Sequence, residues 1–105
     1  MSFQDNLATL PAIDHLAGLD IVDAGGHVVH HIPAAPGKLG SLRVFNALAA
    51  QFGGDLNAAA VAQGLAWFAE HTAAARARPG AHPNIDILLA QEAANSGWRL
   101  VPRPA

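Results

Sequence analysis

The segment 19–32 constrains the fold of this chain more than any other part of its sequence. Two runs rich in valine and isoleucine flank Asp23-Ala24-Gly25-Gly26, and glycine readily adopts the positive φ angles that tight hairpin turns require. The pattern predicts a β-hairpin. Because a two-stranded hairpin alone is marginally stable in water, we expect other elements to pack against it.

Helical patterns fill most of the remaining sequence, because apolar residues recur on one face of each segment. The expected helices span residues 3–10, with one further turn at 13–17, then 42–52 and 55–78, and a third main helix that starts at Asn84 and ends at Gly97. Capping side chains mark the helix starts: Ser2 with Asp5 as a capping box, Ser41, either Asp55 or Asn57, and Asn84.

A last short strand is expected at residues 98–101, before Pro102. This strand and the hairpin form a small antiparallel sheet, which packs against the three main helices and the short N-terminal helix. The sequence therefore predicts an α+β fold in a single domain of residues 1–105. The alternative is a helical bundle whose hairpin is an arm that reaches a partner.

Charge and composition exclude several classes of function. The chain has a formal net charge of −2, one lysine and five scattered arginines, whereas nucleic-acid binders present a dense basic face. Its longest uncharged helical stretch, 56–69, is shorter than the roughly 20 residues that cross a bilayer, and no signal peptide is visible at its start. We expect a cytoplasmic protein, and the absence of cysteine fits a reducing compartment.

Six histidines raise the question of a metal site. Neighbouring strand residues point to opposite faces, so His30 and His31 cannot converge on one ion. Asp20 faces His31 if the hairpin has a two-residue turn, and His30 if the turn is bulged; the sequence leaves this register open. We expect a cross-strand polar pair of Asp20 with one of these histidines, and neither a metal nor a cofactor.

The loop that contains Gly37, Lys38, Gly40 and Ser41 runs directly into a predicted helix. Free amides at a helix N-terminus, one lysine and one hydroxyl could hold a phosphate or carboxylate. The loop is not a Walker A motif, because Leu39 follows the lysine where a serine or threonine is required. Its alternative role is an ordinary connection whose Ser41 caps the helix. As the second hypothesis we predict a small-anion site at this loop, assisted by His30 or His31, with Asp20 as a further candidate residue.

No catalytic constellation is apparent. Without cysteine there is no thiol nucleophile, and none of the three serines lies in a GxSxG elbow. No set of nucleophile, base and orienting group can be assigned. We therefore expect a protein without catalytic residues.

The alanine-rich helix 55–78 suggests a surface for self-association. If Phe68 faces the core, Gly64, Trp67 and His71 form a flanking strip on this helix. Tryptophan is enriched at the centre of interfaces, so this strip predicts a homodimer contact. The alternative is a broad buried face on a helix that is covered from two sides.

Four segments carry a resemblance to a known family: LDIVD at 19–23, VVHHIP at 28–33, PGKLGSLRV at 36–44 and RPGAHPNID at 78–86. On these segments the chain resembles a small bacterial family that is classed as a domain of unknown function. The resemblance implies no activity, cofactor or site residue. We expect a non-catalytic binding or interaction protein, homodimeric through self-association, with a small-anion site or a histidine metal site as the alternatives.

Overall fold

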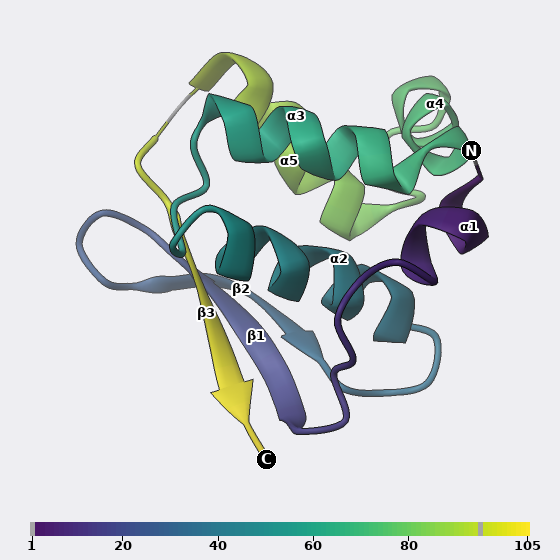
Figure 1. Ribbon diagram of the computed structural model, residues 1–105. Helices are drawn as coiled ribbons and strands as arrows, with labels where there is room; N and C mark the ends of the chain where they lie inside the picture. Colours follow the sequence, from purple (N-terminus) through teal and green to yellow (C-terminus); the bar gives the residue numbers. More distant parts are fainter. Residues whose placement is uncertain (1, 95) are drawn as a thin grey trace.

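The computed structural model describes residues 2–94 and 96–105, and these form five helices and three strands (Figure 1). In chain order the elements are α1 (Phe3–Leu7), β1 (Leu16–Val22), β2 (Val28–Pro33), α2 (Leu39–Gln51), α3 (Ala58–Phe68), α4 (Glu70–Ala77), α5 (Pro83–Ala94) and β3 (Arg99–Pro104). The expected α+β fold is confirmed. No helix among these residues is long and apolar enough to cross a membrane.

The three strands form an antiparallel sheet in the order β2-β1-β3. Side chains alternate between its faces, and Leu19, Ile21, Ile32 and Leu100 point to the helices, where all four are buried. In the described part of the chain the helices lie on one side of the sheet, and its other face is open (Figure 1).

Helix α2 lies between the sheet on one side and α3 and α5 on the other (Figure 1). This position explains why apolar residues occur around most of its circumference and why seven of its residues are buried. The layers meet at Gly64 of α3. A Cβ atom there would lie 2.9 Å from both Leu48 of α2 and Leu88 of α5, so glycine permits the close approach of the three helices.

The hairpin reaches its register through a bulge. The amide of Asp23 donates to the carbonyl of His27 at 2.9 Å, which closes a three-residue turn. A register shift between Ile21 and Val22 then places Asp20 opposite His31 and Ile21 opposite His30. Asp20 therefore pairs with His31, the partner expected for a two-residue turn, although the turn has three residues.

The prediction of one long helix at 55–78 is wrong. The helix is interrupted at Ala69, which adopts φ 49° and ψ −118°, so α3 ends and α4 begins there. Two side chains fit this break: Thr72 Oγ1 donates to the carbonyl of Leu65 at 2.6 Å, and Glu70 Oε1 accepts the amide of Phe3 at 2.7 Å. Of the two expected caps, Asn57 is the one that accepts a helix amide.

Two other helix starts also differ from the prediction. Helix α2 begins at Leu39 rather than at residue 42, so Ser41 lies inside its first turn and does not cap it. Helix α5 begins with Pro83, because the first helical position does not need an amide hydrogen. Asn84 is therefore a helical residue and not the cap.

The remaining boundaries differ by a few residues. The capping box of Ser2 and Asp5 is confirmed, but α1 ends at Leu7 rather than at residue 10. The turn expected at 13–17 is present but shorter: the amide of Leu16 donates to the carbonyl of Ile13 at 3.0 Å, and β1 then starts at Leu16. Helix α5 ends at Ala94 rather than at residue 97, and position 95 lies outside the described residues. Strand β3 continues through both terminal prolines instead of ending at residue 101.

Candidate functional site

A groove follows the first turn of α2. It consists of three depressions that share lining residues, with volumes of about 660, 340 and 170 Å³. The largest and the middle depression share Leu7, Leu39 and Gly40. The middle and the smallest share Gly37, Ser41, His82 and Ile85. All four loop residues predicted to bind an anion, Gly37, Lys38, Gly40 and Ser41, line this groove.

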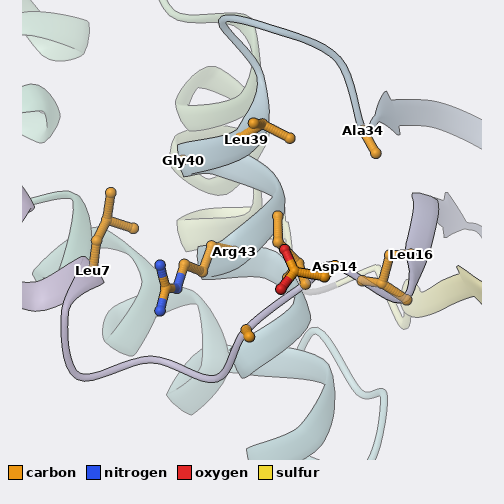
Figure 2. Close-up of a pocket in the computed structure, with 9 residues that line it drawn as sticks. Leu7, Asp14, Leu16, Ala34, Leu39, Gly40 and Arg43 are labelled. Carbon is orange, nitrogen blue, oxygen red and sulfur yellow. The ribbon is translucent and has the colours of Figure 1, made fainter.

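The largest depression is lined by apolar side chains together with one cation, Arg43, and one carboxylate, Asp14. In Figure 2 the side chains of Arg43 and Asp14 lie between Leu7 of α1 and Leu16 of β1. The Nε and Nη2 atoms of Arg43 donate to the carbonyl of Leu10 at 3.3 and 2.8 Å. These bonds orient the guanidinium and leave Nη1 for another acceptor. A volume of this size suits a small organic molecule.

Gly40 explains how this wall of the groove is built. A Cβ atom at Gly40 would lie 3.1 Å from the ring of Phe3, so the absence of a side chain lets α1 approach the first turn of α2. The sequence predicts Gly40 as a site residue from its place in the loop, but it gives Arg43 only as one of five scattered arginines. Sequence carries no signal for Arg43, because its anchor is a backbone carbonyl of a distant segment.

The smallest depression lies where the first turns of α2 and α5 meet. The first amides of a helix have no acceptor inside the helix, and no side chain caps α2, whose N-cap residue is Lys38. Lys38 and Ser41 line this depression from α2, and His82 and Asn84 line it from α5. Two helix N-termini and a lysine therefore contribute positive charge to one small volume.

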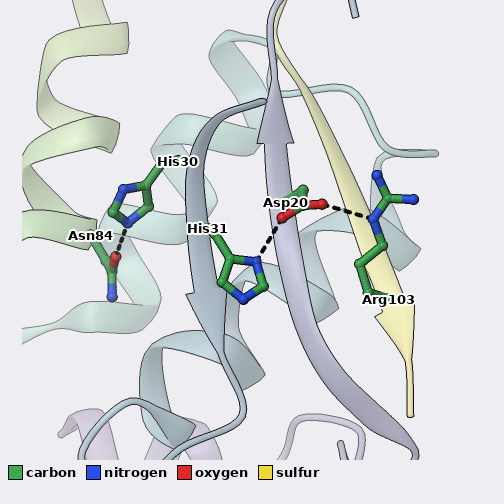
Figure 3. A network of polar contacts seen from close by, with 5 residues as sticks. All are labelled: Asp20, His30, His31, Asn84 and Arg103. Atoms are coloured by element: carbon green, nitrogen blue, oxygen red, sulfur yellow. Dashed lines mark hydrogen bonds and ion pairs between the residues drawn. The ribbon is translucent and has the colours of Figure 1, made fainter. Parts of the chain in front are cut away.

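The three predicted residues of the sheet do not all join the groove. His30 faces the helices, and its Nε2 donates to Asn84 Oδ1 at 2.7 Å (Figure 3). This bond places His30 behind the rim of the smallest depression. His31 and Asp20 lie on the open face of the sheet, away from Lys38.

On that open face Asp20 accepts hydrogen bonds from two side chains (Figure 3). His31 Nδ1 donates to Asp20 Oδ1 at 2.6 Å, and Arg103 Nε donates to Asp20 Oδ2 at 2.8 Å. The hydrogen bond from Arg103 is the main cause that lowers the pKa of Asp20, and the bond from His31 adds to it. The expected cross-strand pair is therefore Asp20 with His31. The part of Arg103 was missed, because 83 positions separate it from Asp20.

The strip expected for self-association is only partly exposed. Gly64 is buried among the helices of the same chain. Trp67 is half-buried against the core, and its carbonyl accepts Asn6 Nδ2 at 3.0 Å. His71 packs edge-on against Phe3, with ring centres 4.8 Å apart. Much of the surface of these three residues is therefore covered within the chain, and their contact with a partner stays a prediction.

The histidines are distributed over separate places. His27 lies near Asp23 at the hairpin turn, and His71 lies near His82 in the groove, with ring centres 5.8 Å apart. Among residues 2–94 and 96–105, no three histidine or carboxylate side chains come close enough to hold a metal ion. The geometry of the described residues thus favours the groove over a metal centre.

The fold is a small α+β domain with an open three-stranded sheet, and the groove around α2 is its candidate binding site. The chain belongs to DUF2322, a family described as an uncharacterized protein conserved in bacteria, whose model matches residues 3–101. The resemblance seen in the sequence is thereby confirmed. Searches of curated proteins and of solved structures gave no match.

Proposed function

We propose that this protein is a cytoplasmic, non-catalytic binding protein for a small molecule that has an apolar body and an anionic group. The observation that carries the proposal is the continuous groove around the first turn of α2, with apolar walls at one end and unpaired helix amides at the other. The apolar body lies between Leu7, Leu16 and Leu39, and the anionic group meets Arg43 or Lys38.

Two cations of the groove support an anionic ligand, and they outnumber the one carboxylate, Asp14, that lines the largest depression beside Arg43. Arg43 is held by the carbonyl of Leu10 before any ligand arrives, so little side-chain entropy is lost when an acceptor binds. Lys38 lies beside two helix N-termini, which favour negative charge. The net charge of −2 disfavours the phosphate backbone of nucleic acid as the ligand.

The proposal is tested by NMR titration of ¹⁵N-labelled protein with two probes, octanoate and inorganic phosphate. Octanoate combines an apolar chain with a carboxylate, and we expect it to shift the amides of Leu7, Leu39 and Gly40 and the Nε–H of Arg43. Phosphate is expected to shift the amides around Lys38 and Asn84 alone.

Variants separate the two ends of the groove. Arg43→Gln retains a donor for the carbonyl of Leu10 and is expected to weaken octanoate binding. Lys38→Ala is expected to weaken phosphate binding, and Arg78→Ala, which removes an exposed arginine outside the groove, leaves both unchanged. Shifts that are absent, or that scatter over the surface with either probe, would refute the proposal.

A further inference from the structure

The two edge strands of the sheet, β2 and β3, differ in whether their outward backbone amides are available to pair with another strand. In an antiparallel strand the backbone groups of alternate residues point to the same side. The amide of Ala34, just after β2, donates to the carbonyl of Ala17 at 2.9 Å. By alternation, His30 and Ile32 direct their backbone groups to β1, and His31 directs its own to the outer side of β2.

The outer edge of β3 is closed. Leu100 directs its amide outward, where it donates to the carbonyl of Gly54 at 2.7 Å. The next outward positions, two and four residues further on, are Pro102 and Pro104, which have no amide hydrogen. No outward amide of β3 therefore remains for another strand.

The outer edge of β2 is open over the residues that the structure describes. No hydrogen bond from outside the sheet reaches the backbone of Val29 or His31 there. The bulge leaves Val29 without a residue opposite it on β1. The exposed fraction is 42% for Val29 and 53% for Val28. A strand edge that has free backbone groups and no charged side chain can pair with another chain.

We propose that the outer edge of β2 pairs with β2 of a second copy of this chain, in antiparallel orientation about a two-fold axis at His31. The pairing joins the two sheets into one of six strands. It places Val29 opposite Pro33 of the second copy, so that the carbonyl of Pro33 can accept the amide of Val29, and Pro33 itself has no amide to leave unpaired.

The charge pattern of this edge favours a second copy as the occupant. A two-fold axis brings identical residues together, so any aspartate, glutamate, lysine or arginine on the edge would meet its like. Residues 27–33 contain none of these four residue types. Because β3 is closed, the assembly has one open edge in each copy and stops at two chains rather than growing into a fibre.

The absence of cysteine from the native chain permits a specific test with His31→Cys. Residues that face each other in a hydrogen-bonded antiparallel pair have Cα atoms about 5.5 Å apart, which suits a disulfide. We expect the two His31→Cys chains to form an intermolecular disulfide rapidly under mild oxidant. Gln51→Cys, an exposed position on α2, serves as the control and is expected to react slowly.

Light scattering on cysteine-free variants completes the test. The parent protein is expected to have the mass of a dimer at high micromolar concentration, and Val29→Lys the mass of a monomer. The matched control is Leu39→Lys, since Leu39 is similarly exposed, at 48%, but lies in the groove; it is expected to remain a dimer. A dimer that survives Val29→Lys, or equal oxidation of the two cysteine variants, would refute pairing through β2. A parent protein that is monomeric at every concentration would also refute this pairing. The remaining candidate for the edge of β2 would then be an extended segment of another protein.

Discussion

The two faces of strand β1 share one backbone but depend on different interactions. On the covered face Leu19 and Ile21 are fully buried against the helices, so their contribution comes from apolar area and close packing. On the open face Asp20 is held between His31 and Arg103, and Gly18 lies below the imidazole ring of His31. The covered face is therefore stabilised by apolar packing. The open face is stabilised by the hydrogen bonds to Asp20, and it needs a glycine at position 18 to make room for His31.

The largest effect is expected on the covered face. Ile21→Ala removes fully buried methyl groups and leaves a cavity that the helices cannot fill, so it should lower the free energy of unfolding by about 2–5 kcal/mol. Urea denaturation followed by circular dichroism measures this loss. Val101→Ala, opposite Asp20 on β3, is the comparison on the open face and should cost about 1 kcal/mol or less. Equal losses at the two positions would contradict the distinction between the faces.

Gly18→Ala probes the contact between glycine and imidazole. The added Cβ would lie 2.6 Å from the carbonyl oxygen of Ile32 and 2.8 Å from Cε1 of His31. The ring can rotate away but the backbone cannot, so we expect a loss of about 1–3 kcal/mol of stability. Repeating the substitution in a His31→Ala background separates the two contacts. If the backbone contact dominates, most of the loss persists in that background; full recovery would assign it to the ring.

The smallest effect is expected for the polar cluster itself. The hydrogen bond from Arg103 lowers the pKa of Asp20 in the folded chain. The stabilisation by Asp20 is therefore complete above the pKa of the unfolded chain and is lost as the pH falls through the lower, folded-state pKa. Arg103→Gln should raise the pKa of Asp20, as measured by ¹³C NMR of its carboxyl group, and should cost only about 0–1 kcal/mol at neutral pH. An unchanged pKa would show that Arg103 does not hold the carboxylate in solution.

The sequence is informative where local chemistry determines the structure. The hairpin follows from its glycine turn and its β-branched runs, and the start of α3 follows from Asn57, which accepts the amide of Ala60 at 2.9 Å. The break at Ala69 carries no such signal, because alanine is the residue with the highest helix propensity. The early starts of α2 and α5 were missed for a related reason. Neither Lys38 nor Pro83 has a side chain typical of an N-cap. Ser41 and Asn84 have such side chains, but they lie within the first turn.

The candidate site was predictable in part. The sequence predicts the loop residues near Lys38 as candidates, because glycines and a lysine before a helix are typical of anion sites, and in the structure these residues line the groove. The apolar end of the groove could not be found, since Leu7, Leu16 and Leu39 meet only after α1 folds back against α2. The separation of His31 from the loop depends on the bulge at Val29, and the hairpin sequence did not decide between the alternative registers.

The break at Ala69 also divides the chain into parts that can open separately. Helix α4 buries one residue, Ala75, and few buried apolar contacts mean a low free energy of local opening. Helix α3 carries the packed glycine and does not need to move when α4 does. His71 of α4 lines the middle of the groove, so one wall of the candidate site belongs to a helix with few buried apolar contacts. A bound molecule that contacts this wall would slow the opening of α4 and leave the exchange behaviour of the sheet unchanged.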